Sequence, residues 1–202
     1  MGQVVARKRA AGLLDEAAAA LEAEPEGAVP ARWIQLLKAA LDAPVADAGP
    51  LLRIGHALED QGRHEAAHDF FTEAVQLQPD SPLTWTNLGE IRRKLGRWED
   101  ALAAYDKALG IDPVYLWALA GRGEALRMLG RLDDAVVAFG SAIARAPDHL
   151  FALQGLAATL SELGRHRDAL PIWESALRLR PESGFASDGL ARCHDALAKE
   201  MA

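Results

Sequence analysis

The stretch HEAAH, residues 64–68, places two histidines one helical turn apart with a glutamate beside the first. In zinc proteases this pattern lets the two histidines bind the metal while the glutamate acts as general base. Here His64 and His68 would be the ligands and Glu65 the base. A zinc site needs further ligands, however, and none follows at a spacing typical of such enzymes. Whether HEAAH forms a zinc site therefore depends on the kind of helix or loop in which it lies.

Two other candidates for chemistry are weaker. Gly121-Arg122-Gly123 is predicted to lie within a helix and does not follow a strand, so a phosphate-binding loop is not expected there. Cys193 is the single cysteine, which excludes an intrachain disulfide and suits a reducing compartment. We interpret it as an inert, packed thiol. We predict no catalytic residue, no metal site and no cofactor.

Composition limits the classes of partner. The 202 residues are 50% hydrophobic and 25% charged, which is enough to bury a core. A net charge of −7 gives no basic footprint for nucleic acid, so none is expected as a partner. No run reaches the roughly 18 apolar residues of a membrane span, and Asp15 and Glu16 interrupt the apolar character that a secretory signal needs. We therefore expect a cytoplasmic protein without membrane insertion.

An internal repeat organises most of the chain. Glycines recur in steps of 34 residues, and prolines and two sets of alanines keep the same period. A glycine in the left-handed conformation ends a helix, and a proline stops the next one. Each repeat therefore reads as two helices of about 14 residues. The recurring positions are Gly62, Gly96, Gly130 and Gly164; Pro79, Pro113, Pro147 and Pro181; Ala67, Ala101, Ala135 and Ala169; and Ala74, Ala108, Ala142 and Ala176.

These residues resemble the tetratricopeptide repeat (TPR) family, whose pattern puts Trp, Leu, Gly, Tyr, Ala, an aromatic residue, Ala and Pro at fixed repeat positions. The resemblance covers residues 48–183 and implies an all-α fold, a right-handed α-solenoid of helix-turn-helix repeats (a TPR-like superhelix). In this register HEAAH occupies positions 17–21, and we interpret its histidines as packing residues. The best copy supplies Trp85, Leu88, Gly89, Ala101, Tyr105, Ala108 and Pro113, and departs at Arg92.

The predicted domain organisation follows this register. Residues 1–47 are interpreted as an N-terminal helical hairpin, with helices at about 3–24 and 30–43, serving as a degenerate repeat, a cap or a partner-binding element. Residues 184–202 are predicted to form a C-terminal capping helix, which a stack of repeats needs to end in water. The four complete repeats are predicted at 48–81, 82–115, 116–149 and 150–183.

The resemblance implies a concave groove lined by the first helix of each repeat. Repeat position 2 there carries Leu83, Trp117, Phe151 and Phe185, which we call the apolar stripe. The stripe could bind apolar side chains of a partner or pack against the loop of the neighbouring repeat. A basic cluster of Arg93, Lys94 and Arg127 could meet a partner carboxylate or simply balance nearby glutamates. The predicted groove residues are Leu83, Asn87, Glu90, Arg93, Lys94, Trp117, Glu124, Arg127, Phe151, Gln154 and Phe185.

We therefore predict a non-enzymatic scaffold or adaptor that binds a partner peptide or helix in the groove. The alternative is a self-assembling scaffold, in which the groove takes the N-terminal hairpin of another copy and builds a homo-oligomer. Family arrays that hold the acidic tails of heat-shock chaperones use a specific set of Lys, Asn and Arg residues, of which only Asn87 is present here. A clamp of that type is not expected.

Overall fold

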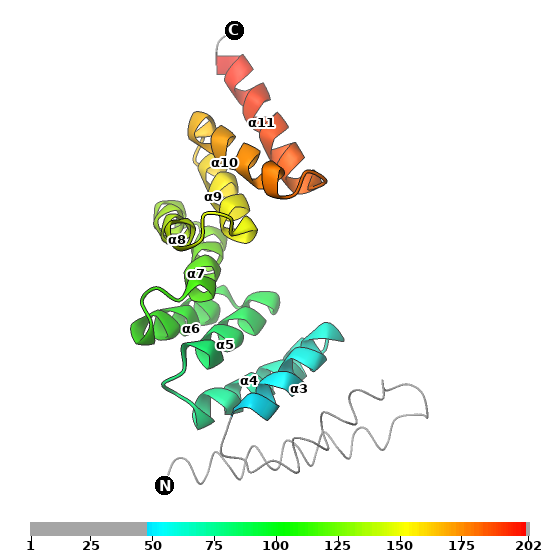
Figure 1. The fold of residues 1–202 in the computed structure, drawn as a ribbon, viewed down its shortest axis with the longest axis vertical. Helices are drawn as coiled ribbons and strands as arrows, with labels where there is room; N and C mark the ends of the chain where they lie inside the picture. Colours follow the sequence, from blue (N-terminus) through cyan, green and yellow to red (C-terminus); the bar gives the residue numbers. More distant parts are fainter. Residues whose placement is uncertain (1–47, 201–202) are drawn as a thin grey trace, which may run out of the picture. The chain divides into compact units, whose positions relative to one another are not determined.

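The computed structural model describes residues 48–200, and every element in that part of the chain is an α-helix (Figure 1). The predicted helices at 3–24 and 30–43 lie outside the described residues. None of the helices in 48–200 combines the length and apolar character that a membrane span needs. The helices are α3 (Gly49–Asp60), α4 (His64–Leu77), α5 (Pro82–Lys94), α6 (Trp98–Ile111), α7 (Leu116–Met128), α8 (Leu132–Arg145), α9 (Leu150–Glu162), α10 (His166–Leu179) and α11 (Gly184–Glu200).

Short turns separate the two helices of each repeat, and their geometry explains the glycine period. Gly62, Gly96, Gly130 and Gly164 have φ values of 72°, 72°, 74° and 71°, a left-handed conformation that other residues rarely adopt. After α3, the N–H of Arg63 donates to the carbonyl of Leu58 at 2.9 Å, a bond that closes the helix end. The predicted glycine turn is therefore confirmed.

The second helix of each repeat ends two residues before the recurring proline. The residue that precedes a proline is pushed out of the helical region by the pyrrolidine ring. Gln78, Ala146 and Arg180 stand at that place, and their φ values of −131°, −140° and −140° are accordingly extended. The proline thus ends the helix through its preceding neighbour.

The chain divides into two compact units, Met1–Arg97 and Trp98–Ala202. In the first unit, α4 packs between α3 and α5 around a core that includes Ile54, Phe71 and Ile91. In the second unit, each helix from α6 to α11 packs on the next, and the first helices of successive repeats, α7, α9 and α11, also contact one another (Figure 1). The second unit therefore holds a continuous run of stacked helices.

Small residues set how closely these helices approach. The recurring alanines, for example Ala135 and Ala142 in α8, are fully buried. Gly155 on α9 lies directly against Phe139, since a Cβ added there would meet the ring at 2.3 Å. Gly121 and Gly189 face Tyr105 and Trp173 in the same way, at 2.4 and 2.5 Å. Each of these glycines makes room for the aromatic residue of the preceding second helix, so Gly121 lies within a helix, as predicted, and has a packing role.

The last helix, α11, has one buried and one charged side. Ala186, Gly189 and Cys193 are buried, while Arg192 and Asp195 are exposed. This amphipathic pattern lets α11 pack on α9 and α10 with one side and face water with the other.

Candidate partner-binding surface on the first helices

The four residues of the apolar stripe are all exposed to solvent. Their side chains are 46% (Leu83), 61% (Trp117), 39% (Phe151) and 54% (Phe185) exposed. The residues two positions further along α7 and α9, Leu119 and Leu153, are by contrast buried in the core. Helical phase causes this difference, because residues two apart point to different sides of a helix. Leu119 therefore belongs to the core and Trp117 to the surface.

The rings of Trp117 and Phe151 both pack against the ring of His149. The centroids of Trp117 and His149 are 5.0 Å apart with an interplanar angle of 73°, and those of His149 and Phe151 are 6.5 Å apart at 83°. We call these three residues the aromatic cluster. Trp117 thus packs on the turn that leads into the next repeat, and more than half of the residue is still exposed to solvent.

His149 is the residue of this surface that the sequence predictions missed. It is the N-cap of α9, where its Nδ1 accepts a hydrogen bond from the backbone N–H of Ala152 at 3.2 Å. A backbone N–H can only donate, so Nδ1 carries a lone pair and the proton of the neutral ring is on Nε2. Burial lowers the pKa of His149, against the opposing effect of Asp148, and so favours this neutral form.

Buried aromatic rings support the stripe in the second unit. Phe151 packs edge-to-face on Phe139, with centroids 6.4 Å apart, and Phe185 packs in the same way on Trp173 at 5.4 Å. The residue four positions after Phe151 and after Phe185 is a glycine, and the buried ring occupies the space beside it: a Cβ would lie 2.3 Å from Phe139 at Gly155 and 2.5 Å from Trp173 at Gly189. Phe151 and Phe185 are therefore supported by buried rings and remain exposed to solvent.

The basic cluster is already balanced by carboxylates of the chain. Arg93 pairs with Glu90 in the same helix, and Lys94 lies 2.7 Å from a carboxylate oxygen of Glu59 on α3. Hydrogen bonding from His56, and then from Lys94, lowers the pKa of Glu59 to about 2, although burial opposes the shift. The first unit thus offers ion pairs at this surface and not a set of unbalanced cations.

Arg127 is held in the same way in the second unit. It lies 2.7 Å from Glu124 on α7 and also pairs with Glu162 at the end of α9. The hydrogen bond to Glu124 is the largest effect that raises the pKa of Arg127. These contacts fit the alternative in which the basic residues balance nearby glutamates, and they tie α7 to α9.

The two predicted amide residues differ in their contacts. Gln154 donates from Nε2 to Oγ of Ser183 at 3.0 Å, and that oxygen also accepts from the backbone N–H of Ala186 near the start of α11. Gln154 therefore helps to hold the next first helix in place. The Nδ2 of Asn87 is buried and has no hydrogen-bond partner among residues 48–200.

The residues of the HEAAH motif do not form a metal site in the described part of the chain. Glu65 pairs with Arg97 at 2.9 Å, and His68 lies 3.6 Å from Asp69. No group of three potential metal ligands occurs within residues 48–200. Cys193 is fully buried, with its Sγ 3.2 Å from Oγ of Ser161.

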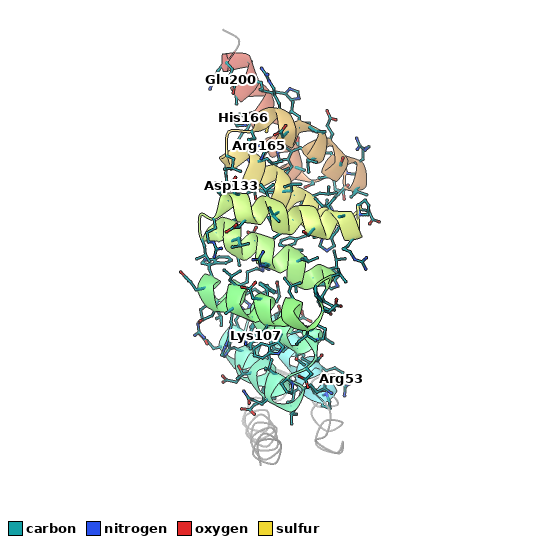
Figure 2. All side chains as sticks on the ribbon, turned by 90° about the vertical axis from the view of Figure 1, so that its left-hand side faces the viewer. Arg53, Lys107, Asp133, Arg165, His166 and Glu200 are labelled. Carbon is teal, nitrogen blue, oxygen red and sulfur yellow. The ribbon has the colours of Figure 1, made fainter. Side chains whose placement is uncertain are left out.

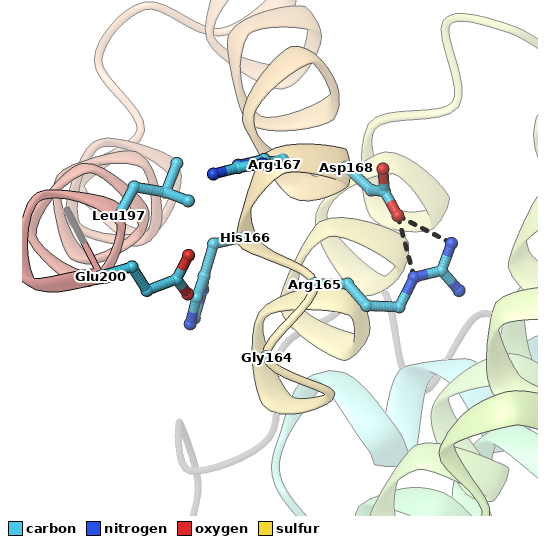
Figure 3. Close-up of a pocket in the computed structure, with 7 residues that line it drawn as sticks. All are labelled: Gly164, Arg165, His166, Arg167, Asp168, Leu197 and Glu200. Atoms are coloured by element: carbon cyan, nitrogen blue, oxygen red, sulfur yellow. Dashed lines mark hydrogen bonds and ion pairs between the residues drawn. The ribbon is translucent and has the colours of Figure 1, made fainter.

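A shallow cavity of about 330 Å³ lies where α10 begins and α11 ends. Figure 2 shows His166, Arg165 and Glu200 near one another at this end of the second unit. In the close-up, His166 lies beside Glu200, while Arg165 pairs with Asp168 on the other side of α10 (Figure 3). No predicted groove residue lines this cavity. Its lining residues are Gly164, Arg165, His166, Arg167, Asp168, Leu197 and Glu200.

The fold and the repeat pattern agree with comparisons to known proteins. The tetratricopeptide repeat family matches residues 34–82, 52–115 and 86–149, which together span more than half of the chain, so this protein belongs to that family. Members of the family typically act as non-enzymatic scaffolds for protein–protein interaction. A search of curated proteins gives no match.

Solved structures support the same fold. A thermophilic tetratricopeptide repeat protein of Thermus thermophilus is 23% identical, with a TM-score of 0.65 over 74% of this chain and 82% of that one. MamA from Desulfovibrio magneticus RS-1 is 20% identical, with a TM-score of 0.61 over 76% and 93%. The first TPR domain of human RPAP3 is 24% identical, with a TM-score of 0.58 over 61% and 97%. At these identities the likeness concerns the fold alone.

Proposed function

We propose that this protein is a non-enzymatic, cytoplasmic scaffold or adaptor that binds a peptide or helix of a protein partner on the first helices of its repeats. The observation that carries the proposal is the recurrence of an exposed large apolar residue at one repeat position. Trp117, Phe151 and Phe185 occupy it in the second unit, and each is at least 39% exposed. An isolated exposed apolar residue needs no explanation, but a repeated one indicates an interaction site.

The support beneath these rings strengthens the proposal. Aromatic side chains dominate binding energy when they are held rigidly, because little conformational entropy is lost on association. Phe151 rests on the buried Phe139, and Trp117 on His149, so both rings are pre-positioned. A partner that covers them would gain apolar burial without reorganising the surface.

Quantitative affinity capture from the native cell tests this function. The bait is the full chain, compared with a Trp117→Ala, Phe151→Ala double variant. Val137→Ala is the matched control, since Val137 is 66% exposed but lies on the second helix α8. The proposal expects partners to be lost with the double variant and kept with the control. Equal recovery by all three baits would refute it.

A second candidate is self-assembly through residues 1–47. It is favoured by the apolar residues at helical spacing in that segment, which could supply the helix that the surface binds. Light scattering of the full chain and of a chain lacking residues 1–47 separates the two functions. A mass that rises with concentration only in the full chain would support assembly, whereas a constant monomer mass in both would exclude it.

A further inference from the structure

The aromatic cluster has an unusual set of polar groups. The indole Nε1–H of Trp117 makes no hydrogen bond to any residue in 48–200, although its ring packs on His149. The Nε2–H of His149 likewise has no acceptor in that part of the chain, because the hydrogen bond of this ring uses Nδ1. Both groups are donors. The cluster therefore presents donors and ring faces but no acceptor of its own.

The walls of the cluster are apolar and accessible. Trp117 is 61% exposed, and Phe151 is 39% exposed. The glycines four positions later, Gly121 and Gly155, are buried against Tyr105 and Phe139. Both rings meet the imidazole of His149 nearly perpendicularly, at 73° and 83°.

A matching ligand must supply acceptors and apolar rings without bringing donors that would stay unpaired. An ordinary extended peptide carries one N–H per residue, and a buried unpaired N–H is costly. Lysine and arginine side chains carry only donors, so they would face the donors of Trp117 and His149. An acidic segment would meet the carboxylate of Asp148, which already acts on His149. These three classes fit the cluster poorly.

Proline meets both requirements. It has an apolar ring and a carbonyl acceptor but no N–H, and consecutive prolines adopt the polyproline II helix with every carbonyl available. One turn of that helix advances by about 9 Å, so a short proline-rich segment is long enough to contact two rings that lie 5.0 and 6.5 Å from the imidazole of His149. The helix is formed before binding, so association loses little entropy.

We propose that the aromatic cluster of Trp117, His149 and Phe151 binds a proline-rich segment of a protein partner in the polyproline II conformation. A pyrrolidine ring packs on Trp117, and a carbonyl of the segment accepts from the indole N–H. The Nε2–H of His149 donates to a second carbonyl, and Phe151 contacts the following ring. This inference rests on the proposed function, because it names the class of partner for the same surface.

The test is an NMR titration of the full chain with a blocked decaproline peptide. The indole N–H signal of Trp117 is assigned by its absence in Trp117→Phe. We expect decaproline to shift this signal and the ring signals of His149. Trp117→Phe keeps an aromatic ring and loses the donor, so it should weaken binding roughly threefold to tenfold, the effect of one hydrogen bond. Trp117→Ala should abolish measurable binding, and Val137→Ala should leave it unchanged.

Two further peptides of the same length test the other classes of ligand for the aromatic cluster. One is a lysine-rich peptide and the other is an amphipathic helical peptide with leucine at every third or fourth position. Tighter binding of either peptide than of decaproline overturns the inference, as does binding of decaproline that ignores Trp117→Ala. If decaproline does not bind but affinity capture still depends on Trp117 and Phe151, the proposed function is supported and only the assignment of a proline-rich partner is wrong.

Discussion

Adding a single methyl group at Gly155 should destabilise the second unit. In Gly155→Ala the new Cβ would lie 2.3 Å from Cζ of Phe139, well inside van der Waals contact. Phe139 is fully buried, and its ring also lies directly against Gly123 on α7. Overpacking of this kind costs about 1–3 kcal/mol. Alanine has the better helix propensity by about 1 kcal/mol, so we expect a net loss of up to about 2 kcal/mol in the free energy of unfolding.

Gly140→Ala is the matched control for this prediction. Gly140 lies inside α8, and a Cβ there would meet nothing within 4 Å. The substitution should therefore stabilise the protein by about 0.5–1 kcal/mol through helix propensity alone. Urea unfolding followed by far-ultraviolet circular dichroism measures both variants, and the two midpoints should move in opposite directions.

A double variant identifies the cause. Combining Gly155→Ala with Phe139→Leu removes the ring that the new methyl group meets. The combined loss should then be smaller than the sum of the two single losses, since the two residues are in contact. Gly155→Ala with the stability of Gly140→Ala would refute the close packing of α9 on α8.

Three further predictions concern the charged and titrating groups. Arg127→Gln leaves Glu124 and Glu162 without their cation and should cost about 1 kcal/mol in chemical denaturation, whereas Arg131→Gln, which breaks a half-exposed pair, should cost under about 0.5 kcal/mol. The pKa of Glu59 is lowered from 4.5 to about 2, so the unfolded chain binds a proton at a higher pH than the folded chain does. Stability should therefore fall as pH drops from 4.5 to 2. Glu59→Gln should reduce this dependence of the melting temperature on pH. The pKa of His149 is lowered from 6.5, so the unfolded chain again binds a proton more readily than the folded chain. Stability should therefore decrease as pH falls below 6.5. His149→Asn keeps a residue that can cap α9 and should remove the part of the pH dependence that comes from His149. A pH profile unchanged by either substitution would contradict the corresponding contact.

The repeat architecture could be predicted from the sequence because its determinants are local. A glycine with positive φ and a proline that displaces its preceding residue act within a few positions, so their 34-residue period translates directly into helix ends. Helical phase is equally local, and it separated the buried Leu119 from the exposed Trp117.

The contacts between repeats were harder to predict, because they join residues about one period apart. Lys94 pairs with Glu59 and Arg127 with Glu162, and each pair links the end of one first helix to that of the next. A comparison of neighbouring repeat positions could have suggested these pairs. His149 gave no such signal, since the other repeats hold serine or tyrosine at its place. Its role depends on where the turn before α9 brings the ring relative to Trp117.

The central claim is that the exposed rings of α7 and α9 bind a protein partner. Affinity capture with the wild-type chain, with Trp117→Ala, Phe151→Ala and with Val137→Ala, at equal bait concentration and matched folded fraction, tests it most directly. The proposed function predicts that at least one partner is recovered equally by the wild type and Val137→Ala and is reduced at least tenfold by the double variant, which corresponds to about 1.4 kcal/mol. Equal recovery of every partner by all three would contradict it.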